Sequence, residues 1–127
     1  MVKQYMKGYR AERSLVHELS KKGFMVVRTP HSGSMNIASP DIIAAKGGKL
    51  FVIECKSRED AFTVQKEQLD EMRQWVDKAG AEAYIGWKIS RRGWSFLKLD
   101  DVAGNNGNIG KKFAREKGIP IDSIFSI

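Results

Sequence analysis

Residues 40–56 read PDIIAAKGGKLFVIECK, and this stretch decides the fold. Two apolar runs, residues 42–45 and 50–53, flank a central Lys-Gly-Gly-Lys sequence. A Gly-Gly pair between two such runs is a strong signal for a tight turn, because glycine adopts the positive φ angles that two-residue hairpin loops require. The stretch therefore predicts an antiparallel β-hairpin.

The Gly-Gly turn also determines which residues face one another across the hairpin. Three pairs follow from it: Ala45 with Leu50, Ile43 with Val52, and Asp41 with Glu54. Directly opposed side chains have Cβ atoms roughly 4.5–5.5 Å apart, so the two carboxylates repel each other unless a positive charge lies between them. Because side chains alternate along a strand, Lys56 shares the face of Glu54, whereas Cys55 points away. A hard divalent cation, which prefers oxygen ligands, is the simplest charge to hold two acids together.

Both faces of the hairpin are apolar, a pattern typical of central strands that are covered on both sides. Charged residues are costly at such a place. Two interpretations remain open at this point. Asp41 and Glu54 form a functional site with Lys56, or they mark strand ends in solvent with Lys56 as a salt-bridge partner.

An amphipathic helix is predicted over residues 4–22. Its apolar stripe consists of Ala11, Leu15, Val16 and Leu19. Glu12 lies at the edge of this stripe, so it is either a solvated flank or an acid aimed toward the hairpin. Basic residues recur on another side of the helix: Lys7, Arg10, His17 and Lys21, with Arg13 beside Glu12. They form either a solvated face or a surface that contacts phosphates.

A strand predicted over residues 24–29 leads into a loop before the hairpin. Arg28, near the end of this strand, is placed to reach a phosphate backbone. The loop, residues 30–39, has small polar residues and no periodicity. Because it ends directly before Asp41, it is either an ordinary connector or a segment that closes on a substrate.

The sequence predicts a second helix and a second hairpin after the first hairpin. The helix covers residues 66–79 and carries Gln68 at its start. The hairpin pairs residues 83–89 with residues 94–99. Three arginines in this half of the chain are candidates for phosphate contacts: Arg58, directly after the first hairpin, and Arg91 and Arg92, in the turn of the second.

The last part of the chain differs in composition. Residues 104–108, GNNGN, are predicted to form a linker, followed by a short basic helix near residues 109–117 and an apolar end at residues 119–127. Apolar residues after a linker favour docking, either on the main domain or on a second subunit. We therefore expect a main domain over residues 1–103 and a separately docked segment over residues 104–127.

Length and charge limit the class of protein. The chain has 127 residues, enough for one domain with its own core. Lysine and arginine number 22 against 15 acidic residues, a net charge of +7 that favours a polyanionic partner such as nucleic acid. No run approaches the roughly 18 apolar residues of a membrane span and no signal region is seen, so we expect a cytoplasmic location. A single cysteine, Cys55, excludes an internal disulfide and a cysteine zinc cluster.

The order Pro40-Asp41, hairpin, Glu54-Cys55-Lys56 resembles the Pro-Asp…(Asp/Glu)-x-Lys signature of the metal-dependent nuclease superfamily that includes type II restriction enzymes. Within this superfamily, the chain is similar to the archaeal Holliday junction resolvases of the Hjc type. Three features carry that similarity: Glu12 within KGYRAER, the Ser-Gly-Ser sequence at residues 32–34, and the chain length. The similarity covers about residues 3–100 and fades beyond them.

The resemblance implies a set of site residues. The catalytic group would be Glu12, Asp41, Glu54, Lys56 and Ser32. The metal, Mg²⁺ with Mn²⁺ as a substitute, would be bound by Glu12, Asp41, Glu54 and the backbone carbonyl of Cys55. The DNA-binding residues would be Lys7, Arg10, Arg13, Arg28, Ser34, Arg58, Arg91 and Arg92. Lys56 would orient the attacking water rather than act as a base, because a free lysine has a pKa of about 10.4.

The expected fold is a single α/β domain with a mixed, mostly antiparallel five-stranded sheet flanked by helices, of the restriction-endonuclease-like type. The expected activity is Mg²⁺-dependent resolution of four-way DNA junctions by paired symmetric nicks, which implies a homodimer. Recombination or sliding-clamp proteins are further partners by association with the family, and the protein would be DNA-associated. Two alternatives remain: a related nuclease acting on linear, flap or mismatched DNA, and a non-catalytic DNA-binding domain of the same fold. The role of Gln68 and the number of metal ions stay open.

Overall fold

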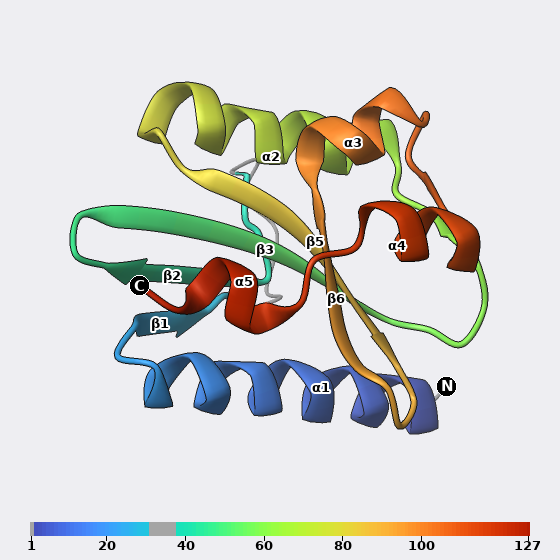
Figure 1. Cartoon of the computed structure of the whole chain (residues 1–127), viewed down its shortest axis with the longest axis horizontal. Coiled ribbons are helices and arrows are strands. Elements are labelled where there is room, and N and C mark those ends of the chain that lie inside the picture. The colour runs from blue at the N-terminus through green and yellow to red at the C-terminus, as the bar shows by residue number, and fades with distance from the viewer. Residues whose placement is uncertain (1, 31–37) are drawn as a thin grey trace.

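The computed structural model describes residues 2–30 and 38–127, with side chains from residue 8 onward in those ranges. A five-stranded sheet in the order β1-β2-β3-β5-β6 forms its centre (Figure 1). The strands are β1 (Met25–Arg28), β2 (Ile42–Lys46), β3 (Lys49–Ser57), β5 (Glu82–Ile89) and β6 (Gly93–Lys98). Neighbouring strands run antiparallel, except for β3 and β5, which run parallel. The prediction of a mixed, mostly antiparallel sheet is confirmed.

The β2–β3 hairpin has the predicted register. Its cross-strand pairs include Ile43 with Val52 and Ala45 with Leu50. Gly47 and Gly48 in the turn have φ angles of 57° and 80°, a left-handed region that glycine adopts without steric cost. The turn therefore aligns the two strands that lead to Asp41 and Glu54.

Helices cover both faces of the sheet. The helix α1 (Val2–Lys21) lies on one face and α2 (Lys66–Ala79) on the other (Figure 1). The helix α2 connects the parallel strands β3 and β5, and it ends at Gly80, whose N–H bonds to the carbonyls of Trp75 and Val76. No helix within the described residues is both long and apolar enough to cross a bilayer.

Two apolar clusters fill the space on either side of the sheet. The cluster under α2 includes Val52, Met72, Ile85, Trp87 and Leu97. The cluster under α1 includes Leu15, Leu19, Phe51, Ile53 and Phe96. Side chains of β3 alternate between the two clusters, so Glu54 and Lys56 belong to the α2 side, while Cys55 packs on the α1 side.

The C-terminal segment packs onto the sheet of its own domain. Ile119 lies in the chain between α4 (Lys111–Lys117) and α5 (Ile121–Phe125), and it forms an antiparallel bridge with Phe96. Phe125 is fully buried in the cluster under α1 and contacts several aromatic rings: Phe24, Phe51, Tyr84 and Phe96. The apolar end of the chain therefore completes this core.

Residues 104–108, where the sequence suggested a linker, instead form a structured turn. They connect α3 (Leu99–Gly104) to β7 (Asn108–Ile109), which pairs with β4 (Phe62–Thr63). The N–H of Val64 donates to the carbonyl of Gly107 at 2.8 Å, and a Cβ on Gly107 would lie 2.2 Å from the carbonyl oxygen of Val64. Asparagine and glycine serve a tight turn with positive φ angles here, not a flexible connection.

Candidate active site

Asp41 and Glu54 lie at the end of the hairpin that is farthest from its turn. Both residues are buried, with 6% and 8% of their surface exposed. The Oδ2 atom of Asp41 accepts a 2.8 Å hydrogen bond from the backbone N–H of Cys55, the residue that follows Glu54. The backbone of Asp41 is held from the other side, because the N–H of Thr29 donates to its carbonyl at 2.9 Å. Two buried acids from adjacent strands therefore meet at one place.

Gln68, in the first turn of α2, connects Glu54 to Lys56. Its Nε2 atom donates a 2.6 Å hydrogen bond to Oε2 of Glu54, and its Oε1 atom accepts a 3.3 Å hydrogen bond from Nζ of Lys56. The Nζ atom of Lys56 also lies 3.9 Å from Oε2 of Glu54. One amide therefore orients the carboxylate and the ammonium group at once.

The site contains more negative charge than Lys56 compensates. Burial raises the pKa of Glu54 from 4.5 to about 8, and the Asp41 carboxylate adds to this rise, while Lys56 opposes it. Burial also raises the pKa of the Cys55 thiol, with further contributions from the surrounding carboxylates. Acids that resist ionisation indicate a poorly hydrated place where negative charges repel one another. Such a place stabilises an added cation.

Glu12 approaches this region from α1. It is buried, with 9% of its surface exposed, and its charge contributes to the raised pKa values of Glu54 and Cys55. The Nε atom of Arg28 donates a 2.9 Å hydrogen bond to Oε1 of Glu12. The guanidinium group of Arg28 also lies over the ring of Tyr9, 4.6 Å from its centroid. Arg28 thus pairs with a buried acid, and its contact with DNA stays a prediction.

The donor set fits Mg²⁺ only in part. Among the described residues, no three His, Cys, Asp or Glu side chains are grouped so that they could hold a metal ion. Glu12 is carried by α1, which packs on the face of the sheet opposite α2. Asp41 and Glu54 remain as a pair, with the backbone carbonyl of Cys55 next in sequence. Two carboxylates and a carbonyl suit Mg²⁺, which retains several waters.

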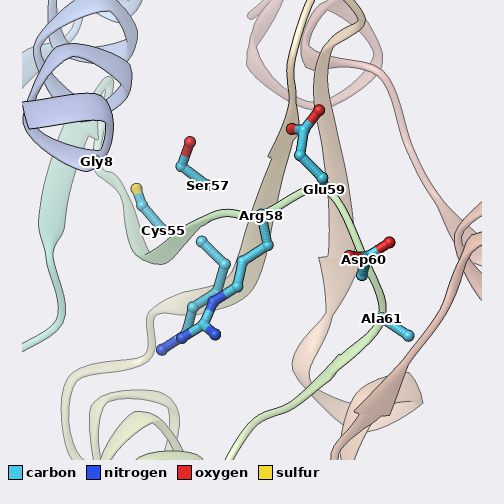
Figure 2. Close-up of a pocket in the computed structure, with 8 residues that line it drawn as sticks. Gly8, Cys55, Ser57, Arg58, Glu59, Asp60 and Ala61 are labelled. Carbon is cyan, nitrogen blue, oxygen red and sulfur yellow. The ribbon is translucent and has the colours of Figure 1, made fainter. Parts of the chain in front are cut away.

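A hollow of about 560 Å³ borders this site, and we call it the β3 cleft (Figure 2). Residues 55–61 line it, and Gly8 of α1 lies on its other side. In Figure 2 the Cys55 side chain points toward α1, whereas the Arg58 side chain points the opposite way. Lys56 belongs to the lining, so a molecule in the cleft would contact the candidate site directly.

Most of the predicted DNA-binding residues that the structure describes are exposed. They are Arg10 and Arg13 on α1, Arg58 at the β3 cleft, and Arg91 and Arg92 in the β5–β6 turn. The turn and the N-terminal half of α1 lie at the same end of the molecule (Figure 1). Three predicted groups lie outside the described residues: the side chain of Lys7, and Ser32 and Ser34.

Trp75 gives the site a second connection to α2. Its Nε1 atom donates a 3.0 Å hydrogen bond to the carbonyl of Ala38, three residues before Asp41. The helix α2 therefore contacts Glu54 through Gln68 and the chain leading to Asp41 through Trp75. Sequence patterns missed this role of Trp75, because they place it on a helix without showing which strand or loop lies opposite.

A mixed sheet that carries two buried carboxylates and a lysine at the ends of adjacent strands defines a nuclease of the restriction-endonuclease-like fold. A family model described as archaeal Holliday junction resolvase (Hjc) matches residues 3–127. The chain belongs to this family.

Individual relatives agree with the family match. The chain is 41% identical over 99 residues to the crossover junction endodeoxyribonuclease Hjc of Sulfolobus acidocaldarius. This alignment covers 76% of this chain and 68% of that protein. It is 35% identical over 124 residues to the crossover junction endodeoxyribonuclease Hjc of Sulfurisphaera tokodaii, covering 93% and 85%. The solved structure of Archaeoglobus fulgidus Hjc, a Holliday junction resolvase, superimposes with a TM-score of 0.82 at 29% identity. That match covers 92% of this chain and 98% of the other.

Proposed function

We propose that the chain resolves four-way DNA junctions by hydrolysing phosphodiester bonds, with Mg²⁺ as cofactor and paired symmetric nicks as the outcome. The observation that carries this proposal is the grouping of the buried Asp41 and Glu54 carboxylates with Lys56. Family membership supports it, because the relatives named above are crossover junction endodeoxyribonucleases.

Hydrolysis of a phosphodiester requires cationic stabilisation, because its negative charge repels the attacking water. Asp41, Glu54 and the backbone carbonyl of Cys55 would hold Mg²⁺, with Glu12 contributing directly or through water, and Mn²⁺ would substitute. When bound, the ion would supply positive charge for the phosphoryl oxygens and lower the pKa of water held at the site. The pKa of Glu54, raised first by burial and further by the Asp41 carboxylate, supports a cation at this position.

The side chains around the acids have separate tasks in this proposal. Lys56 orients the attacking water and stabilises the negative charge that develops on the phosphate. Gln68 keeps Lys56 and Glu54 at a constant separation. Ser32 would approach the metal or the scissile phosphate; it lies outside the described residues, and its role stays a prediction.

The DNA would bind across the exposed arginines at the end of the molecule where the β3 cleft opens. The net charge of +7 supports a polyanionic partner. Contacts to phosphates do not depend on base sequence, so such a surface selects DNA by the shape of its backbone. A cytoplasmic, DNA-associated location and recombination or sliding-clamp partners remain part of this proposal.

Two nicks require two sites, so the proposal includes a symmetric homodimer. Met25 and Val27 support an interface at β1, because both project from one face of this edge strand and are 79% and 58% exposed. Met25→Asp combined with Val27→Asp should convert a dimer to a monomer in sedimentation velocity. A doubly substituted chain that sediments like the wild type would contradict this interface.

A labelled four-way junction incubated with the chain, with and without Mg²⁺, tests the proposed function. We expect two symmetric nicked duplexes, formed only when Mg²⁺ is present. Linear duplex of equal length, added as a competitor, tests the choice of substrate. A preference for the junction of much less than tenfold, or about 1.4 kcal/mol, would favour a nuclease that acts on other DNA.

A further inference from the structure

A second hollow, of about 220 Å³, lies between α4 and the β5–β6 turn, and we call it the α4 pocket. Its apolar part is formed by Trp87, Ile89 and Trp94. Trp94 is held in place by stacking on Phe96, with ring centroids 6.0 Å apart. Three cations complete the lining: Arg92 from the turn, and Lys111 and Arg115 from α4. The pocket therefore combines an aromatic wall with a basic rim.

The three cations of the α4 pocket are available to a ligand. All three residues are exposed, and none of them takes part in the ion pairs found within residues 8–30 and 38–127. Lys112 and Lys117 add positive charge to the same helix, where Glu116 is the one acid in its sequence. Like charges held together without a counterion favour binding of an anion.

The position of α4 is fixed, so its cations cannot simply move apart. Phe113 and Ala114 pack against the apolar core. The helix ends at Gly118, whose N–H donates to the carbonyl of Ala114 at 2.8 Å. A Cβ on Gly118 would lie 2.2 Å from Oγ of Ser95, so this end of α4 rests directly on β6. The basic side of the helix is therefore presented on a rigid support.

Trp87 connects the α4 pocket to the candidate active site. The indole ring lines the α4 pocket, and its Nε1 atom donates a 2.8 Å hydrogen bond to the carbonyl of Arg58. Arg58 lines the β3 cleft together with Lys56. Among the hydrogen bonds of the described residues, one joins an acid to the β5–β6 turn: the N–H of Ser90 donates to the carboxylate of Glu59. A hydrogen bond between a lining residue of each thus connects the two hollows.

We propose that the α4 pocket binds a phosphate and the adjoining sugar of the DNA whose cleaved strand occupies the β3 cleft. This inference rests on the proposed function. The cations would contact the phosphate, and the indole wall would cover the apolar face of the deoxyribose. Each nucleotide of a DNA backbone carries both a charged phosphate and an apolar sugar face, whereas a free inorganic anion carries only the charge.

Binding of a four-way junction in a chelating buffer tests the α4 pocket without cleavage. The test variant is Lys111→Ala combined with Arg115→Ala, and a matched control with equal loss of charge is Lys49→Ala combined with Lys78→Ala. Both control residues are exposed; Lys49 begins β3 at the β2–β3 turn and Lys78 lies in the last turn of α2. The β2–β3 turn and the end of α2 lie at the other end of the molecule from α4 (Figure 1). Lys111→Arg combined with Arg115→Lys keeps the charge and serves as a second control.

We expect the test variant to bind the junction at least about tenfold more weakly than the control at moderate salt. The slope of log K against log salt should fall by about 2, because each lost phosphate contact removes about 0.9. The charge-conserving variant should bind like the wild type. Equal affinities and slopes in the test variant and the Lys49/Lys78 control would overturn the inference.

Wild-type cleavage separates this inference from the function on which it rests. If the wild type cuts junctions in Mg²⁺ and the α4 variant behaves like its control, only the α4 pocket is refuted. If the wild type neither binds nor cuts DNA, both proposals fail. A weakened affinity for inorganic phosphate in the test variant, with unchanged junction binding, would also overturn a site for the DNA backbone.

Discussion

The side-chain amide of Gln68 donates a 2.6 Å hydrogen bond to Oε2 of Glu54. The same amide accepts a hydrogen bond from Lys56, so its removal would release an acid and a cation at once. We predict that Gln68→Ala lowers the single-turnover rate of junction cleavage by about 10–100-fold, the usual effect of losing a group that orients a metal ligand. Junction affinity in a chelating buffer should stay unchanged.

Gln74→Ala is the matched control for this prediction, because Gln74 is an exposed glutamine on the same helix. It should cleave at the wild-type rate. Full activity in Gln68→Ala would show that Glu54 and Lys56 keep their positions without the amide.

Asp41→Asn and Lys56→Ala test the candidate catalytic group itself. Each change removes a charge that acts on the scissile phosphate or its cation, so cleavage should fall by more than about 100-fold. Binding should persist, because exposed arginines elsewhere supply the contacts to the backbone. Gel-shift titration beside single-turnover cleavage would measure both quantities. Parallel loss of binding and cleavage would argue for a role in folding or docking instead.

The raised pKa of Glu54 makes the metal-free protein less stable at high pH. The folded state holds the Glu54 proton up to a pKa of about 8, whereas the unfolded chain releases it near 4.5. The stabilising contribution is therefore complete below about pH 4.5 and is lost as the pH rises through about 8. Urea unfolding in a chelating buffer should show a decline on the order of 5 kcal/mol across this window.

Glu54→Gln removes the titrating group while keeping its shape, so the decline between these pH values should largely disappear. Above about pH 8 this variant should be more stable than the wild type. Glu116→Gln, at an exposed position of α4, is the control and should leave the decline in place. An unchanged slope in Glu54→Gln would contradict the assignment to Glu54.

The ion pair between Arg28 and Glu12 should stabilise the fold. Glu12 has only 12% of its side chain exposed, so Arg28→Ala removes a charge-assisted hydrogen bond from a buried carboxylate. We expect the free energy of unfolding to fall by about 1–3 kcal/mol in urea titration. Arg13→Ala, at an exposed neighbouring position, should change it by no more than about 0.5 kcal/mol. Equal effects of the two substitutions would contradict a structural role for the pair.

Phe125 should contribute strongly to stability although it lies close to the end of the sequence. Its ring is fully buried among four other aromatic rings, so Phe125→Ala should cost about 3–5 kcal/mol in chemical denaturation. Ile127→Ala is the control, because Ile127 is 48% exposed. A loss under about 1 kcal/mol for Phe125→Ala would mean that the cluster closes around the gap.

The sequence predicted the parts of the fold that depend on local signals. The Gly-Gly turn determines the register of β2 and β3, and the apolar periodicity with Gly80 determines α2, whose bounds match the prediction. The sequence did not predict the β4–β7 pair. A hydrogen bond between Val64 and Gly107, which are far apart in the sequence, joins the two segments that follow β4 and precede β7. Two-residue strands have no period of their own, so only tertiary packing reveals them.

The same division applies to the candidate site. The closeness of Asp41 to Glu54 follows from the β2–β3 register, which the sequence predicts and which begins with the next pair, Ile42 and Ile53. The contact between Gln68 and Glu54 does not, because it requires the angle at which α2 lies on the sheet. The pairing of Arg28 with Glu12 likewise depends on how α1 lies beside β1. Sequence patterns therefore found the acids, the lysine and the position of Gln68, but not the contacts that orient the acids.

The indole of Trp75 and the amide of Gln68 attach one helix to the segment that leads to Asp41 and to Glu54 of β3. Undocking of α2 would remove both supports in a single event, so Glu54 would lose its amide partner at the same time as the segment before Asp41 loses its indole partner. Loss of catalytic competence on warming should then coincide with the first cooperative opening of this helix in hydrogen exchange. The working temperature of the enzyme would be limited by α2 rather than by the sheet.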